Sequence, residues 1–219
     1  MTLSEENYLK TVYNLQKHYK KGVPTNAIAE EMETKASSVS DMIKRLAEKE
    51  LLFYKKYQGA KLSETGEKHA VKVVRKHRLW ETFLVEKLNF SWDEVHDIAE
   101  QLEHIESEKL IKELDKLLGY PKTDPHGDPI PDEDGNVVKV EKRMLAEFKK
   151  GEQGVCVGVN DSSSSFLQYL DKHQIALGKV ITVKDKEEFD GSMQLEVDHR
   201  EFNISNLAAN NIYLKTVNS

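Results

Sequence analysis

The spacing of apolar residues in the first third of the chain changes from helical to strand-like. Apolar residues three or four positions apart predict a helix over 4–21, then two short helices over 24–32 and 37–50. Two apolar runs, 51–54 and 60–62, flank a glycine-containing turn and predict a β-hairpin. A helix, two short helices and a hairpin in this order are typical of a winged helix-turn-helix domain.

Longer helical patterns follow this hairpin. They predict helices over 66–89, 92–105 and 107–118, whose apolar faces are too wide to remain exposed. Self-association as a homodimer would bury such faces. The next segment, 124–136, reads DPHGDPIPDEDGN, and its three prolines and two glycines predict irregular structure.

A different pattern begins at residue 154. Four short β-type runs with one inserted helix, over 164–172, predict a small barrel of roughly 65 residues. The expected fold class is therefore mainly α with a small β part. The predicted domains are a winged helix-turn-helix over 1–65, a helical domain over 66–140, a linker over 141–152 and a terminal β domain over 153–219.

The amino-acid composition limits the classes of function that this chain can have. The chain has 219 residues and a formal net charge of −6, yet residues 1–80 carry 16 Lys/Arg against 10 Asp/Glu. This basic excess indicates a surface that faces a polyanion. No apolar run approaches the length of a membrane span, and the N-terminus lacks the apolar core of a signal peptide. The single cysteine, Cys156, fits a cytoplasmic protein and excludes a cysteine-rich metal site.

Polar residues at the start of the second short helix could contact DNA. Serines there can reach phosphates and base edges, and lysines in the hairpin can lie along the backbone of double-stranded DNA. The alternative is that the serines only cap the helix. The expected DNA-binding residues are Thr25, Lys35, Ser37, Ser38, Ser40, Asp41, Lys44, Lys55 and Lys56.

Histidines and glutamates share one stripe of the second long helix. His96, Glu100 and His104 are four residues apart and Glu103 lies on the same face, while the preceding helix offers His77 and Glu81. Nitrogen and oxygen ligands without sulfur suit divalent manganese, iron, cobalt, nickel or zinc. The alternatives are a salt-bridged dimer face and a paired-metal hydrolase. Because no catalytic motif or pocket for a small organic substrate is evident, we do not expect an enzyme.

At this point four segments resemble a known family. RKHRLWETFL (75–84), VHDIAEQLEH (95–104), DPHGDPIP (124–131) and ENYLKTVYNL (6–15) are similar to the diphtheria-toxin-repressor family of metal-dependent regulators. The resemblance implies a homodimer with a winged helix, a helical dimerisation and metal domain, and an SH3-like C-terminal domain. It also implies binding to operators when loaded with iron or manganese, and control of metal-uptake genes.

The resemblance also implies a ligand set. Glu100, Glu103 and His104 would be primary ligands with Asn7, and His77, Glu81 and His96 would form a second site that Asp161 could complete. His126, in the PHG turn, is an auxiliary candidate.

Three positions bear on which metal is bound. The iron-sensing branch commonly has cysteine where Glu100 stands, so Mn²⁺ is the expected cofactor, with Fe²⁺ as the alternative. Asn7 is a weaker ligand than a carboxylate, so the neighbouring Glu6 is the alternative for its place in the primary site. Lys10 stands where some manganese sensors have a second glutamate, which argues against a close-paired dinuclear site of that kind.

Overall fold

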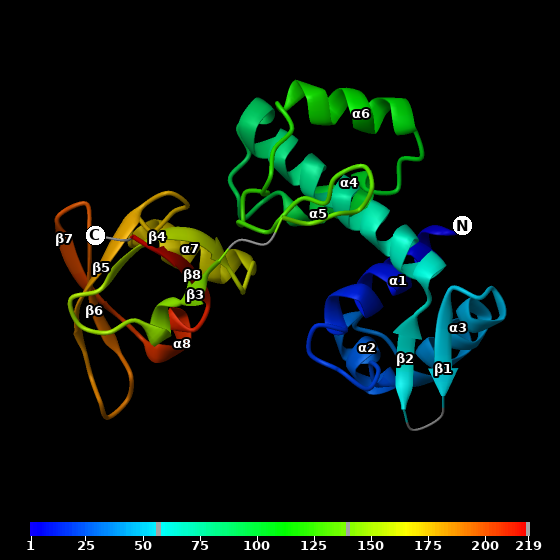
Figure 1. Cartoon of the computed structure of the whole chain (residues 1–219), viewed down its shortest axis with the longest axis horizontal. Helices are drawn as coiled ribbons and strands as arrows, with labels where there is room; N and C mark the ends of the chain where they lie inside the picture. The colour runs from blue at the N-terminus through cyan, green and yellow to red at the C-terminus, as the bar shows by residue number, and fades with distance from the viewer. Residues whose placement is uncertain (56–57, 139–140, 218–219) are drawn as a thin grey trace. The chain divides into compact units, whose positions relative to one another are not determined.

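The N-terminal part of the computed structural model has the predicted winged helix-turn-helix order (Figure 1). The structure describes residues 1–55, 58–138 and 141–217. Helices α1 (Leu3–Leu15), α2 (Thr25–Glu31) and α3 (Ala36–Glu48) precede the antiparallel hairpin of β1 (Leu52–Lys55) and β2 (Gly59–Leu62). A capping box between Thr2 and Glu5 begins α1. Fully buried apolar side chains from α1, α2 and α3 form a shared core.

Helix α1 ends at Leu15 and is shorter than the predicted 4–21, and the side chain of the next residue, Gln16, bonds to the hairpin. Its Oε1 accepts a hydrogen bond from the backbone N–H of Leu62, at 2.8 Å. The chain then turns at Gly22, where φ is +135°. A Cβ at Gly22 would lie 2.4 Å from the carbonyl oxygen of Gln58, so only glycine lets the loop approach the hairpin.

The helical part comprises α4 (Glu64–Leu88), α5 (His96–Leu102) and α6 (Glu108–Leu117). Helix α5 is shorter than the predicted 92–105, because residues 92–95 and 103–104 form turns. Residues 119–138 follow as an irregular segment, which includes the stretch predicted to be irregular, 124–136. Among the described residues, no helix has the length and apolar character needed to cross a bilayer.

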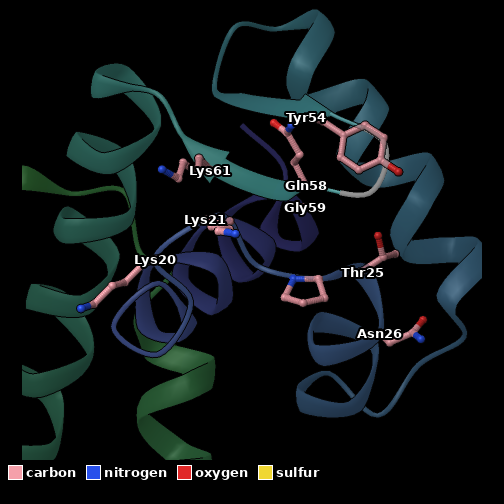
Figure 2. A pocket seen from close by; sticks show the side chains of 10 residues that line it. Lys20, Lys21, Thr25, Asn26, Tyr54, Gln58, Gly59 and Lys61 are labelled. Atoms are coloured by element: carbon pink, nitrogen blue, oxygen red, sulfur yellow. The ribbon is translucent and has the colours of Figure 1, made fainter.

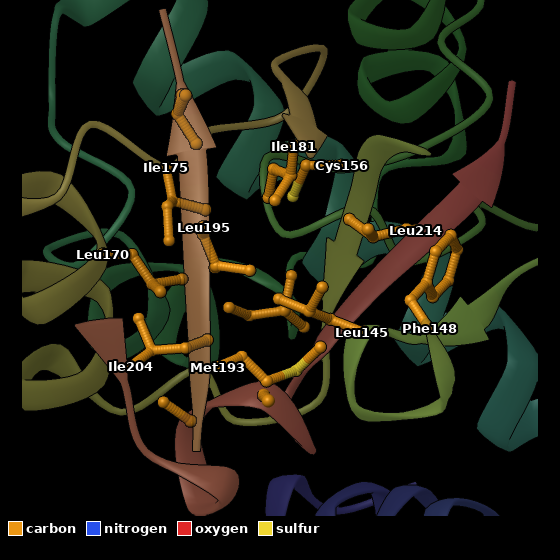
Figure 3. Close-up of a cluster of buried hydrophobic side chains, with 14 of the residues drawn as sticks. Leu145, Phe148, Cys156, Leu170, Ile175, Ile181, Met193, Leu195, Ile204 and Leu214 are labelled. Carbon is orange, nitrogen blue, oxygen red and sulfur yellow. The ribbon is translucent and has the colours of Figure 1, made fainter. Parts of the chain in front are cut away.

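The C-terminal part is one antiparallel sheet with strand order β3-β8-β4-β5-β6-β7. Helix α7 (Ser164–Lys172) has the predicted bounds, and α8 (Asn206–Ala209) precedes the last strand. Side chains from the strands and α7 form one apolar core (Figure 3). The strands are β3 (Arg143–Met144), β4 (Gln153–Val159), β5 (Val180–Lys186), β6 (Met193–Val197), β7 (Arg200–Ile204) and β8 (Ile212–Thr216).

The segment expected as a linker, 141–152, contains structure that belongs to this C-terminal part. Strand β3 pairs with β8, and the 3-10 helix η1 (Leu145–Glu147) follows it. Leu145 and Phe148 are fully buried in the C-terminal core (Figure 3). Burial of these two large apolar side chains explains why the segment packs with the sheet rather than remaining extended.

By backbone contacts the chain forms two compact units. One comprises residues 1–77, 100–111 and 131–137, and the other comprises 78–99, 112–130 and 138–219. Within the second unit, the irregular segment packs against β4. The N–H of Val159 donates to the carbonyl oxygen of His126 at 3.0 Å. Gly127 has φ +83°, and a Cβ there would lie 2.1 Å from the carbonyl oxygen of Val157.

This close approach gives a stability prediction. Gly127→Ala should lower the free energy of unfolding by about 2–4 kcal/mol, because it adds a backbone clash to a left-handed conformation. Gly178→Ala is the matched control, since Gly178 also has φ +83° but a Cβ at that position would meet no atom within 4 Å. It should cost only about 1 kcal/mol. Chemical denaturation measures both, and equal losses would contradict a tight contact at Gly127.

Candidate metal centre and nucleic-acid interface

Helix α3 presents the predicted DNA-binding residues on its exposed face. Val39, Ile43 and Leu46 are fully buried, and this apolar stripe turns the opposite side outward. Ser37, Ser38 and Lys44 are exposed there, as is Lys35 immediately before the helix.

The other predicted contacts differ in their surroundings. The Oγ of Ser40 donates to the carbonyl oxygen of Ala36 at 2.8 Å, which is a bond within α3 and not a helix cap. Asp41 pairs loosely with Lys44, at 3.9 Å between Oδ1 and Nζ. Thr25 is half-buried at the start of α2, Lys55 is exposed at the end of β1, and Lys56 lies outside the described residues.

A basic groove lies between the α1–α2 loop, the start of α2 and the hairpin, with a volume of about 1030 Å³. Figure 2 shows Lys20 and Lys21 from the loop and Lys61 from β2 on one side, and Thr25 and Asn26 on the other. No carboxylate is among its described lining residues. The sequence pattern did not single out Lys20 and Lys21, although both lie in the basic first third. The groove fits a phosphate backbone.

A second charged cluster joins α1 to the end of α5. The Nζ of Lys10 lies 2.5 Å from Oε1 of Glu100 and 2.7 Å from the carboxylate oxygens of Glu103. The Nδ1 of His77 lies 2.6 Å from Oε2 of Glu103. Glu103 is fully buried. Burial would raise the pKa of the Glu103 carboxyl, but the hydrogen bond with His77 and the charge of Lys10 outweigh it and lower that pKa.

His104, a further predicted primary ligand, lies beside this cluster. The Nδ1 of His104 lies 2.6 Å from Oε2 of Glu6, and its Nε2 lies 3.8 Å from Glu103. The side-chain oxygen of Asn7 is buried and has no hydrogen-bond partner among the described residues. A buried amide oxygen without a donor fits a cation ligand, so the donor set suits a metal even though Lys10 faces the same carboxylates.

The third cluster lies in the second unit and is more enclosed. Glu81 of α4 converges with Asp124 and His126 of the irregular segment, and one ligand atom from each lies within 4.8 Å of the others. Their side chains are 2%, 5% and 5% exposed, respectively. The Nδ1 of His96 lies 3.5 Å from Oε1 of Glu81. Two carboxylates and an imidazole in a buried site are a donor set for a divalent cation.

Local structure fixes the positions of Asp124 and His126 in this third cluster. The Oδ1 of Asp124 accepts hydrogen bonds from the backbone N–H groups of His126 and Asp128, which closes the PHG turn. The Nε2 of His126 lies 2.8 Å from the carbonyl oxygen of Trp92 and donates to it. That bond leaves Nδ1, 3.6 Å from Oε2 of Glu81, available to a metal.

The charged groups in and around the Glu81–Asp124–His126 group shift one another's pKa values. Burial raises the pKa of Asp124 to about 7, with help from the charges of Glu81 and Asp128 and against that of Arg78. Burial alone would lower the pKa of His126, but its interactions with Glu81 and Asp124 raise it to about 9. The metal-free site therefore holds protons that a bound cation would displace.

The structure keeps part of the predicted grouping, because Glu81 and His96 of the predicted second site lie close together. His77 bonds to Glu103 of the predicted primary set, whereas Glu81 faces His96 and His126. Asp161 accepts a hydrogen bond from the N–H of Ser163, and it is outside the convergent Glu81–Asp124–His126 group. Asp124 was missed; its signal was a carboxylate two residues before His126 in a proline-rich turn.

Three family models match successive parts of the chain. They are the iron dependent repressor N-terminal DNA-binding domain over residues 1–60, the iron dependent repressor metal-binding and dimerisation domain over 63–132, and the FeoA domain over 143–216. The HTH-type transcriptional regulator MntR of Oceanobacillus iheyensis is 34% identical over 125 residues, which cover 56% of this chain and 82% of that protein. The chain belongs to the diphtheria toxin repressor family.

Other members of the diphtheria toxin repressor family agree with this assignment. The diphtheria toxin repressor of Corynebacterium jeikeium is 37% identical over 128 residues, 58% of this chain and 52% of that protein. The matched segment thus spans about half the length of that relative. A solved manganese-dependent transcriptional repressor in complex with manganese is 35% identical with a TM-score of 0.88, over 97% of this chain and 100% of that one.

Membership confirms the resemblance seen in the sequence. The fold class is also confirmed, with an N-terminal DNA-binding domain, a helical metal-binding and dimerisation domain, and a C-terminal SH3-like FeoA domain. The family consists of metal-dependent transcriptional regulators.

Proposed function

We propose that this protein is a transcriptional repressor that binds double-stranded operator DNA as a homodimer when loaded with Mn²⁺, and that it controls metal-uptake genes. The observation that carries the proposal is the buried Glu81–Asp124–His126 group, in a chain that also has an exposed α3 face and a basic groove. One part offers ligands to a cation and the other fits a nucleic acid. A metal-gated regulator needs both.

The donor chemistry favours manganese. The Glu81–Asp124–His126 group offers oxygen and nitrogen atoms only, and hard oxygen ligands suit Mn²⁺. Cys156 is buried in the core of the C-terminal sheet, where burial raises the pKa of its thiol to about 11. A bound divalent ion would balance the two carboxylates and hold the irregular segment to α4.

An Fe²⁺-responsive repressor on the same scaffold is the second candidate. The specific observation for it is that two of the matching family models are described as iron dependent. Fe²⁺ also accepts mixed oxygen and nitrogen ligands. Affinities for both ions, measured side by side under reducing conditions, distinguish the two.

The deciding experiment measures DNA binding with and without metal. A labelled promoter fragment from a neighbouring metal-transporter gene is titrated with the full chain, with Mn²⁺, with Fe²⁺ or with excess chelator. We expect tight, salt-sensitive binding with Mn²⁺ and weak binding with chelator. Equal binding with Mn²⁺ and with chelator would contradict metal-dependent DNA binding. Absence of binding in every condition would contradict the proposed repressor function.

Metal binding should also release protons. At pH 7 the raised pKa of His126, about 9, keeps the imidazole protonated in the metal-free chain, and Asp124, with a pKa of about 7, is partly protonated. Since a cation binds the deprotonated ligands, Mn²⁺ affinity should rise as the pH increases from about 6 to about 9. Calorimetry in two buffers with different ionisation enthalpies should show about one proton or more released per ion. An affinity that is constant over this range would contradict the site.

A further inference from the structure

Lys10 occupies the place of a cation in the cluster at the end of α5. Its ammonium group lies 2.5 Å from Glu100 and 2.7 Å from Glu103, and the Lys10 side chain is only 11% exposed. These carboxylates belong to the set that the family resemblance assigns to a metal. The structure therefore shows a positive charge of the chain itself on the groups that a divalent ion would use.

The same contacts hold α1. Lys10 and Glu6 both lie on α1, and they bond to Glu103 and His104, respectively, beyond the end of α5. The contacts are short, and Glu6, Lys10 and Glu103 are at least nine-tenths buried. Helix α1 is thus tied to the α5 region by side-chain contacts.

We infer that Lys10 competes with a divalent cation for Glu100 and Glu103, and so sets the metal concentration at which this cluster fills. An incoming ion must displace the ammonium from both carboxylates, and Asn7 adds only a neutral oxygen. This inference rests on the metal binding in the proposed function.

The other candidate centre differs in the cation that faces its carboxylates. In the Glu81–Asp124–His126 group a fixed cation lies on one of the two carboxylates: Nε of Arg78 is 3.4 Å from Oδ2 of Asp124, whereas Glu81 faces the imidazole of His126, whose Nδ1 is itself a possible ligand atom. The ammonium of Lys10, by contrast, lies on both Glu100 and Glu103 and offers a metal no ligand atom. The Glu81–Asp124–His126 group therefore fills first, and the chain has one tighter class of site and one weaker class.

The two classes of site give the regulator a second Mn²⁺ concentration at which its metal occupancy changes. At low Mn²⁺ only the Glu81–Asp124–His126 group is occupied, and Lys10 still holds α1. At higher Mn²⁺ the ion takes over the carboxylates and can use Asn7 of the same helix as a ligand. Helix α1 remains tied in both states, because one positive charge replaces another.

The test is a Mn²⁺ titration of the metal-free full chain without DNA, followed by the electron paramagnetic resonance signal of free Mn²⁺. The wild type should show two classes of site. Lys10→Met and Lys10→Gln should each tighten the weaker class by about tenfold or more and leave the tighter class unchanged. The control is Lys68→Met, which removes the same charge from an exposed pair with Glu64 and should change neither class.

Hydrogen exchange in α1 provides a second measurement. With chelator, Lys10→Met should lose protection in α1, and Mn²⁺ should restore it; the wild type should be protected in both conditions. Unchanged affinity of the weaker class in both Lys10 variants would overturn the inference, and so would protection that Mn²⁺ fails to restore. Absence of Mn²⁺ binding in the wild type would instead refute the proposed function, so the two failures are distinguishable.

Discussion

His126→Ala should abolish Mn²⁺-dependent operator binding at metal concentrations that saturate the wild type. The substitution removes the only imidazole of the Glu81–Asp124–His126 group and leaves two buried carboxylates facing each other. Loss of a ligand from a three-residue site should weaken Mn²⁺ affinity by about 100-fold or more, because even groups that only orient ligands are worth about 10–100-fold. The measurement is operator affinity as a function of free Mn²⁺.

The control is His18→Ala, since His18 is exposed and follows α1. It should retain the wild-type response. If His126→Ala keeps the wild-type Mn²⁺ dependence, the Glu81–Asp124–His126 group is not the regulatory site. Full operator binding by His126→Ala with chelator present would show instead that this histidine restrains the DNA-binding state.

Local patterns of the sequence predicted the elements well. The bounds of α7 were predicted correctly, because its apolar residues have a clear helical spacing between a serine start and a following turn. The winged order also followed from periodicity and one glycine turn. Strand β3 was missed because it has only two residues, and its pairing with β8 depends on a segment about 70 residues away.

The site could be predicted only as a set of residue types. Helical spacing placed His77 and Glu81 on one face, but it could not say which neighbour each would meet. In the structure His77 meets Glu103, and Glu81 meets His126 of the irregular segment. The position of Asp124 follows from hydrogen bonds within a proline-rich turn, and periodicity does not report on such geometry.

The contacts of Lys10 are a second example of an interaction that the sequence alone could not predict. The position of Lys10 in the sequence argued against a close-paired dinuclear site, but did not indicate that the ammonium would bond to Glu100 and Glu103. The distance in sequence is about 90 residues, and only the packing of α1 near the end of α5 brings these groups together. Long-range ion pairs of this kind depend on tertiary structure.

A double charge reversal tests whether the basic groove is the surface that binds DNA. Reversing two charges, as in Lys20→Glu with Lys21→Glu, should weaken operator binding by about 100-fold or more, because each new carboxylate would repel the phosphates that the lysine attracts. Non-specific DNA should weaken by a similar factor, since phosphate contacts carry no sequence information. The dependence of log affinity on log salt should fall by about 2, one for each lost contact.

The double variant Ser37→Ala with Ser38→Ala tests recognition of bases separately from contacts with phosphates. These exposed serines lie at the start of α3, so their loss should reduce the preference for operator over random DNA and leave the salt dependence nearly unchanged. The charge-matched control is Lys149→Glu with Lys150→Glu, an exposed lysine pair in the C-terminal part. Fluorescence anisotropy at several salt concentrations measures all three. If the Lys149–Lys150 reversal weakens binding as much as the Lys20–Lys21 reversal, total charge rather than the groove determines affinity, and the proposed interface is wrong.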